Sequence, residues 1–181
     1  MGWVDRDEFW RCLGKALKCA GVHQQHALLC VDLDGLKAIT DTDGQTAASA
    51  VLRQCSDLLL PELQQDDLLT QLDDNKLGLL LLNRSQGQIL QTARLLRAAL
   101  QNSRLRWQDK IFRLGVNTGL VPITDHPRQL TDVRAAVEAA CREAKRRGNN
   151  CIHTVHPEDV KLSRRQPNLM TMQRENDEQR S

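Results

Sequence analysis

Apolar and polar residues alternate along the chain with two spacings, which predict helices interspersed with short strands. Apolar residues three or four positions apart predict helices over 6–20, 46–60, 86–101 and 129–147. Short apolar runs predict strands over 27–33, 67–72, 77–82 and 151–155, and a further strand pair over 105–107 and 111–120. Residues 35–41 can form one or two helical turns before Asp43-Gly44 breaks them. About five strands with helices packed on the sheet indicate an α/β or α+β fold.

Several of these elements end at residues with a known local role. Asp5 is predicted to cap the first helix, with Glu8 three residues on as in a capping box. The acidic segment 73–76 lies between two apolar runs and predicts a β-hairpin. Gly148 is expected to close the last helix. From residue 161 onward apolar residues nearly vanish, so we expect a domain over 1–160 and a charged tail or linker over 161–181 that leads to a further domain.

Composition narrows the functional classes. The chain has 181 residues, a net charge of +2 and only 3% aromatic residues, as expected for one domain with an aliphatic core. This balance gives no electrostatic reason to expect a nucleic-acid polymer or a membrane as a partner. The longest aliphatic run, Leu79–Leu82, is far below the ~20 residues of a membrane span, and no signal peptide is visible. We therefore expect a cytoplasmic location and no membrane contact by this segment.

The cysteines are dispersed, which is typical of reduced thiols in a cytoplasmic protein. The spacing of Cys151, His153 and His156 suits zinc, but no fourth ligand is nearby. A separate, acidic cluster is formed by Asp32, Asp34, Asp73 and Asp74. It could bind a divalent ion.

Four weak motifs in order resemble the GGDEF domain of the diguanylate cyclase family. Residues 32–44 read DLDGLKAITDTDG, where the family reads D-x-D-x-F-K-x-x-N-D-x-x-G. Residues 115–123 and 138–150 are similar to the family's V-S-I-G strand and A-x-x-A-K-x-x-G-R-N helix end. The resemblance implies an α+β (α/β sandwich) fold: the ferredoxin-like palm of nucleotide cyclases, with an about five-stranded, mainly antiparallel sheet flanked by helices.

The signature of this family is altered at nearly every position. Where the family reads R-L-G-G-D/E-E-F, the chain has Gln71, Leu72, Asp73, Asp74, Asn75, Lys76 and Leu77. Two glycines would let the backbone adopt positive φ and approach a triphosphate, whereas two aspartates add bulk and negative charge there. The third position supplies a metal-binding carboxylate in the family, but a neutral amide is a weak ligand for Mg²⁺. Lys76 reverses the charge of the fourth position.

Other positions that the resemblance assigns are also changed. The guanine-reading residues correspond to Thr40 and Ser49, and a phosphate-contacting arginine corresponds to Asn149. The product-inhibitory motif R-x-x-D becomes Gln64 to Asp67, without the arginine that would grip phosphate.

A few family residues survive. The resemblance gives Asp32 and the backbone of Leu33 metal roles, Lys37 and Lys145 nucleotide roles, and it retains Asp34. Each has a simpler interpretation, because aspartates cap helices at strand ends and lysines on helices are usually solvated.

Three functions follow from the resemblance. The first is a catalytically inactive regulatory or interaction domain in cyclic di-GMP signalling. Its partner would be an EAL-type phosphodiesterase domain in cis or trans, or another signalling domain, with a homodimer as a further possibility. This domain needs no cofactor, and any phosphodiesterase activity would come from the EAL partner. The alternative is a sensor that binds GTP, with Mg²⁺, without cyclising it. An active cyclase is the least favoured.

Overall fold

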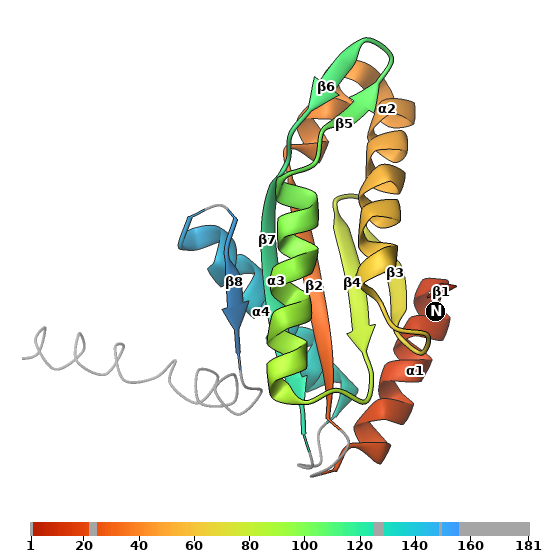
Figure 1. The fold of residues 1–181 in the computed structure, drawn as a ribbon, viewed down its shortest axis with the longest axis vertical. Coiled ribbons are helices and arrows are strands. Elements are labelled where there is room, and N and C mark those ends of the chain that lie inside the picture. The colour runs from red at the N-terminus through yellow and green to blue at the C-terminus, as the bar shows by residue number, and fades with distance from the viewer. Residues whose placement is uncertain (1, 22–24, 125–128, 149, 156–181) are drawn as a thin grey trace, which may run out of the picture.

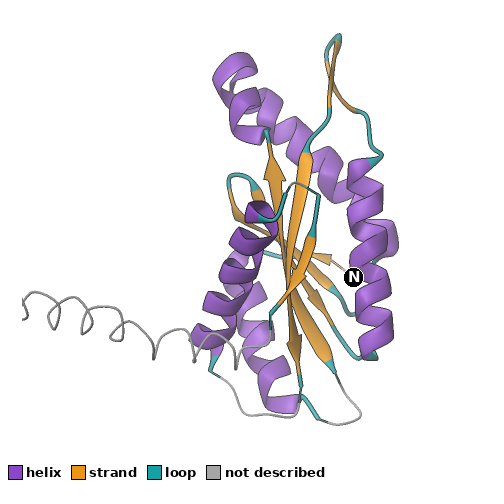
Figure 2. Ribbon diagram, turned by 90° about the vertical axis from the view of Figure 1, so that its left-hand side faces the viewer, coloured by secondary structure: helices purple, strands orange, loops and turns teal. Residues whose placement is uncertain are grey.

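The computed structural model describes residues 2–21, 25–124, 129–148 and 150–155, which form three layers. A six-stranded sheet lies in the middle, with two helices on each face (Figure 1). The helices α1 (Arg6–Cys19) and α4 (Leu130–Arg146) pack on one face, and α2 (Leu36–Leu59) and α3 (Gln86–Gln101) pack on the other (Figure 2). This is the expected α+β sandwich.

The sheet is antiparallel in its interior and parallel at both edges. The strand order is β1-β3-β4-β2-β7-β8, in which β1 is Gly2–Trp3, β3 is Leu68–Asp73, β4 is Lys76–Leu81, β2 is His26–Asp34, β7 is Gly115–Ile123 and β8 is Ile152–Thr154. The pairs β1–β3 and β7–β8 are parallel. The prediction of a mainly antiparallel sheet is confirmed. The sequence missed β1 because a two-residue strand has no recognisable hydrophobic period.

The helices begin and end close to where the pattern placed them. Asp5 caps α1 as predicted, and Gly148 follows α4 with a φ of 117°. The break at Asp43-Gly44 is present, because Gly44 has φ 87° and ψ 169° inside α2 and divides it into two helical segments. A short 3-10 helix, Leu60–Glu62, follows α2 at Pro61.

The expected strand over 111–120 is wrong. Residues in this range belong to two different strands: β6 (Lys110–Phe112) pairs with β5 (Leu105–Trp107) in a separate hairpin, and β7 pairs with β2 over nine residues. Gln108, with φ 50°, makes the tight turn between β5 and β6. The apolar residues of this range do not indicate where one strand ends and the next begins, because that boundary depends on what each strand packs against.

The two faces of β2 position the candidate site. Odd-numbered residues such as Leu29 and Leu33 point into the α2–α3 core, and even-numbered residues such as Leu28 and Cys30 point into the α1–α4 core. The same alternation places Asp32 and Asp34 on the α4 face at the end of the strand.

Close packing brings α4 down onto the sheet there. A Cβ on Gly119 of β7 would lie 2.6 Å from the backbone nitrogen of Cys141, so only glycine permits this approach. None of the helices that the structure describes is long and apolar enough to cross a membrane. The tail expected over 161–181 lies outside the described residues.

Candidate functional site

The turn between β3 and β4 carries the signature positions and leads into the end of β2. Asp73 ends β3 and Lys76 begins β4, so the turn consists of Asp74 and Asn75. None of these residues has a positive φ, and the amide of Asp74 donates to the carboxylate of Asp73 (2.9 Å). The turn is therefore stabilised by its own acidic side chain and does not use the left-handed backbone that glycines would permit.

Asn75 closes over the end of β2. Its side-chain nitrogen donates to Asp32 Oδ1 (2.6 Å), and its backbone carbonyl accepts from the amide of Leu33 (2.9 Å). Lys76 lies opposite Asp32 in the strand register, and Leu77 is buried in the core. The structure thus brings together the predicted residues of the strand end and of the signature.

Lys145 reaches the same place from the last turn of α4. Its ammonium lies 2.8 Å from Asp34 Oδ1 and 3.6 Å from Asp32 Oδ2. The hydrogen bond to Asp34 and the charge of Asp32 raise the pKa of Lys145 above its usual value. Lys145 is exposed, as expected for a solvated helix lysine, and its charge is in addition paired with these two carboxylates.

The other simple interpretations have different outcomes. Asp32 and Asp34 do not cap α2: Gly35 is its N-cap residue, with φ 100°, and no side chain bonds there. Lys37 is exposed and has no hydrogen bond or ion pair with any described residue, in agreement with a solvated helix lysine.

The donor set around Asp32 does not fit a divalent cation. Asp32 is buried (6% exposed), and one of its oxygens accepts from an amide while the other faces an ammonium. Hard cations need several oxygen ligands, and neither the N–H group nor the ammonium can serve. Within the part of the chain that the structure describes, no three His, Cys, Asp or Glu side chains are placed to hold a metal ion.

The described residues also show no zinc site at the Cys151 and His153 spacing. All six cysteines are free thiols, and the Cys151 thiol donates to the carbonyl of Gly148 (2.8 Å). His153 lies on β8, and His156 is outside the described residues.

The guanine-reading positions lie on α2. The Thr40 hydroxyl donates to the carbonyl of Leu36 (3.2 Å), one helical turn earlier, so it is already used by the helix. Ser49 is exposed and lines a cavity of about 430 Å³ together with Trp3, Leu52 and Asp57, among others. Asn149 lies outside the described residues.

Asp67 is a structural residue in the core. It is fully buried, and it accepts from the amides of Gln64 (2.8 Å) and Leu82 (2.9 Å) and from the guanidinium of Arg84. Arg84 is 6% exposed and also donates to the hydroxyl of Thr92 (2.5 Å). Sequence reasoning missed Arg84, since the only available signal is one arginine after an apolar strand. The Gln64 side chain is exposed, but the Asp67 carboxylate is buried and used by these contacts.

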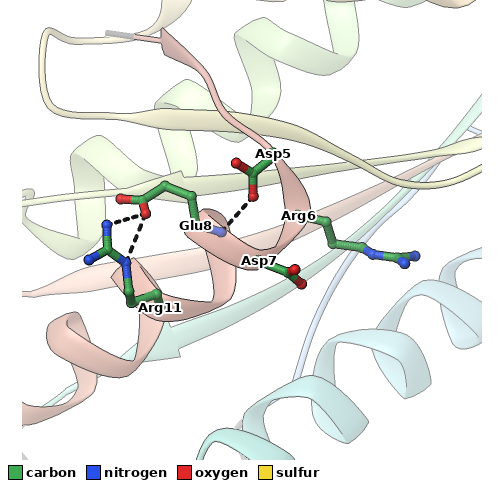
Figure 3. A pocket seen from close by; sticks show the side chains of 5 residues that line it. All are labelled: Asp5, Arg6, Asp7, Glu8 and Arg11. Carbon is green, nitrogen blue, oxygen red and sulfur yellow. Dashed lines mark hydrogen bonds and ion pairs between the residues drawn. The ribbon is translucent and has the colours of Figure 1, made fainter.

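A charged pocket at the start of α1 does not add to this site. Figure 3 shows Asp5, Arg6, Asp7, Glu8 and Arg11 around it. Asp5 accepts from the amide of Glu8 (2.8 Å), which confirms the predicted cap. The Glu8 carboxylate bonds Arg11, which lowers the pKa of Glu8, and so does not complete a capping box. The carboxylates of Asp5 and Glu8 are therefore satisfied within the first turns of the helix, and Arg6 donates to the carbonyl of Leu72 on β3 (3.3 Å).

The segment order, the sheet and the position of the signature turn agree with one family. A profile described as "Diguanylate cyclase, GGDEF domain" matches residues 4–151. The chain belongs to the GGDEF family. GGDEF domains belong to cyclic di-GMP signalling. This chain retains their fold and the aspartates Asp32 and Asp34 at the end of β2.

Individual relatives show the same relationship. A probable diguanylate cyclase of Escherichia coli, DgcE, is 30% identical over 138 residues, which cover 76% of this chain and 12% of DgcE. The GGDEF domain of TpbB (YfiN) from Pseudomonas aeruginosa superposes with a TM-score of 0.77 at 22% identity, over 88% of this chain and 94% of that one. Diguanylate cyclase SiaD of the same organism, solved in complex with its activator SiaC, gives a TM-score of 0.77 at 19% identity, over 83% of this chain and 58% of SiaD. The chain thus spans a small part of DgcE.

Proposed function

We propose that this chain is a catalytically inactive GGDEF domain that acts as a regulatory or interaction module in cyclic di-GMP signalling. The observation that carries the proposal is the contact between Asn75 and Asp32, at 2.6 Å. An amide donor and the Lys145 ammonium stand where the family's chemistry needs oxygen ligands, so the charge of Asp32 is neutralised by the protein itself. Phosphoryl transfer depends on metal-held charge neutralisation and positioning, which this arrangement does not supply.

The changed signature turn supports the same proposal. Asp73 and Asp74 are both exposed, so a triphosphate approaching the turn would meet two negative charges. Their side chains also prevent the close backbone approach that two glycines would give. The turn therefore repels the anionic substrate of a cyclase as well as lacking its metal ligand.

A second function, the binding of GTP without cyclisation, is favoured by one observation. The cavity of about 430 Å³ that Ser49 lines is large enough for a nucleobase, and the indole of Trp3 at its rim is half exposed and could stack on one. In this alternative the exposed ammonium of Lys37 contacts phosphate, with Mg²⁺ carried by the nucleotide. The proposed inactivity applies to both functions.

The interaction role implies a partner. The resemblance favours an EAL-type phosphodiesterase domain in cis or trans, reached through residues 161–181, and a cytoplasmic location. SiaD supports the general idea, since it was solved in complex with an activator protein. A homodimer is the other candidate assembly.

The test of inactivity is a cyclisation assay with GTP and Mg²⁺, followed by chromatography of the nucleotides. We expect no cyclic di-GMP, because each lost electrostatic contact of this kind typically costs about 10²–10³ in rate. A GGDEF domain with an intact signature serves as the control. Turnover within tenfold of the control would refute the proposal.

Calorimetric titration with GTP separates the two functions. If GTP binds and the substitution Trp3→Ala abolishes the heat, while Trp107→Ala leaves it unchanged, the sensor alternative is correct. If no heat is detected, the domain is an interaction module without a nucleotide ligand.

A further inference from the structure

The β5–β6 hairpin extends beyond the end of the main sheet, on the side of α2 (Figure 1). Its two strands pair Leu105 with Phe112, Arg106 with Ile111 and Trp107 with Lys110. The inner face is apolar: Leu105 is 2% exposed and belongs to the α2–α3 core, and Trp107 and Phe112 pack against that core. Successive strand residues point to opposite faces, so Arg106 and Ile111 lie side by side on the outer face.

The outer face combines unpaired positive charge with an exposed apolar side chain. Ile111 is 54% exposed, the largest exposure among the exposed large apolar side chains in the described residues. Arg104 and Arg113, which flank the two strands at two residues along the chain from this pair, are also exposed. No described residue forms a hydrogen bond or ion pair with the side chain of Arg104, Arg106 or Arg113.

We propose that this outer face, formed by Arg104, Arg106, Ile111 and Arg113, is a docking surface for an acidic protein segment that presents carboxylates around an apolar side chain. The proposal names a surface for the interaction module proposed above and rests on that function. Guanidinium groups bind carboxylates through two parallel hydrogen bonds, and arginine is enriched at protein interfaces.

Charge and composition favour this occupant over a nucleic acid. An exposed isoleucine at the centre of the patch gains from apolar contact, which a phosphate backbone does not offer. The net charge of the whole chain is only +2, well below that of a typical nucleic-acid-binding domain. Three arginines on and directly beside one strand pair are enough to position a short acidic segment.

The hairpin is joined to both segments of α2. The side chain of Gln54 donates to the carbonyl of Arg106 (2.7 Å) and accepts from its amide (2.9 Å). Lys110 forms an ion pair with Asp43, the residue before the break at Gly44. The Gln54 contacts hold the second segment of α2, and the ion pair of Asp43 tethers the first segment, residues 36–43, to the hairpin. A partner on the outer face would act on Lys37 and Thr40 through Asp43.

The test uses a fluorescein-labelled synthetic peptide in which glutamates flank a single leucine, titrated onto the whole chain and followed by anisotropy. The variant Arg104→Gln/Arg106→Gln/Arg113→Gln should bind about tenfold more weakly, because each exposed pair contributes only modestly. Ile111→Ser should also weaken binding. The matched control Arg94→Gln changes an exposed arginine on α3 and should leave the affinity unchanged. Circular dichroism checks that each variant is folded.

Four results would overturn the proposal. They are equal affinity of the triple variant and the unchanged chain, equal binding of a peptide with glutamine in place of glutamate, tighter binding of a DNA duplex that displaces the peptide, and self-association through the patch in place of peptide binding. None of these involves GTP, so failure here is distinguishable from failure of the cyclisation assay.

The tether is tested separately by NMR. The peptide should shift the backbone amide signals of Lys37 and Thr40 in the unchanged chain. Asp43→Asn removes the ion pair with Lys110 without altering the charges of the hairpin surface, so the affinity should stay within about twofold while those distant shifts disappear. Distant shifts that persist in this variant would refute coupling through Asp43.

Discussion

At the scale of single residues, position 75 has the largest effect on the site. An aspartate or glutamate there would place two carboxylates next to each other, and only a cation between them would relieve their repulsion. Asn75 converts that repulsion into a hydrogen bond with Asp32, and Lys145 completes the neutralisation. One amide therefore makes the end of β2 stable without a metal ion.

The substitution Asn75→Asp tests this account. We expect it to lower the free energy of unfolding by about 2 kcal/mol in the absence of divalent cations, because a hydrogen bond to a charged group is lost and a like charge is added. Mg²⁺ should recover part of the loss. Urea denaturation with and without Mg²⁺ measures both effects.

The matched control for this experiment is Gln65→Glu, which adds one negative charge at an exposed loop position. It should change stability by less than about 0.5 kcal/mol with or without Mg²⁺. If Mg²⁺ stabilises the control as much as Asn75→Asp, or stabilises neither, the explanation of position 75 is wrong.

A second residue gives the domain a pH dependence. His26 is 4% exposed, its Nδ1 accepts from the amide of Asn83 (3.1 Å), and burial lowers the pKa of His26 below its usual value. The unfolded chain therefore binds a proton at a higher pH than the folded chain does. Stability should be complete above about pH 6.5 and should fall as the pH decreases from there to the lowered pKa.

Thermal melts between neutral and mildly acidic pH check this expectation. The variant His26→Gln keeps an acceptor for the amide of Asn83 and should show a smaller loss of melting temperature on acidification. Some slope should remain, because burial also lowers the pKa of His153. An unchanged slope in His26→Gln would mean that His26 does not contribute.

At the scale of elements, the β3–β4 hairpin depends on a buried ion pair beneath it. Asp67 precedes β3 and Arg84 follows β4, so their contact holds both outer ends of the hairpin together. The carboxylate also accepts two backbone amides, which satisfies its remaining lone pairs. This explains why the aspartate of the R-x-x-D motif can persist where the arginine is absent: it has a structural role independent of any ligand.

Breaking this pair should be costly. Arg84→Met leaves an uncompensated buried carboxylate and should reduce the free energy of unfolding by about 3–5 kcal/mol. Adding Asp67→Asn to Arg84→Met should restore part of the loss, because the remaining buried charge is removed. Chemical denaturation of the single and double variants measures this, with Arg94→Gln as an exposed control.

The opposite outcome would be informative. If Arg84→Met is within about 0.5 kcal/mol of the unchanged chain, the pair is not a stabilising contact. Asp67 would then be free to serve a ligand, and titration with cyclic di-GMP should detect it. With the pair intact we expect no tight binding of cyclic di-GMP at Gln64 and Asp67, since the exposed amide of Gln64 cannot grip phosphate as a guanidinium does.

At the scale of the whole molecule, the residues that stabilise the fold differ from those that would perform the chemistry. An aliphatic core on both faces of the sheet holds the GGDEF architecture, and of the changed site positions that the structure describes only Leu77 belongs to it. Function depends on sites placed on a fold, so the architecture can be retained when the site is changed. Rebuilding activity should therefore require changes at several separate places.

We expect that restoring the signature alone will not restore cyclisation. A five-fold variant changes only the signature positions: Asp73→Gly, Asp74→Gly, Asn75→Asp, Lys76→Glu and Leu77→Phe. An eight-fold variant also changes the positions assigned to guanine and phosphate: Thr40→Asn, Ser49→Asp and Asn149→Arg. Only the second should form product, because a misplacement of about 1 Å can reduce the rate about 10²-fold.

Both variants are assayed at equal concentration, with the melting temperature of each as the check on folding. If the five-fold variant is as active as the eight-fold one, the contacts to guanine and phosphate matter less than we infer. The inactivity of the natural chain would then depend on the hairpin alone.

The amino-acid sequence by itself determined most of the elements, because each has its own hydrophobic period or end signal. The cap at Asp5, the break at Gly44 and the hairpin around 73–76 are local features, so they were predicted correctly. The split between β6 and β7 and the presence of β1 were not, because both depend on which strand lies alongside.

The site shows the same division. Sequence identified Asp32, Asn75 and Lys145 as important positions, since residue type and order are visible along the chain. Only the tertiary structure decided what they do to one another: the strand register and the close approach of α4 at Gly119 bring an amide and an ammonium onto one buried carboxylate. Likewise, the burial of Asp67 and its pairing with Arg84 depend on contacts between residues far apart in the chain, which no local pattern encodes.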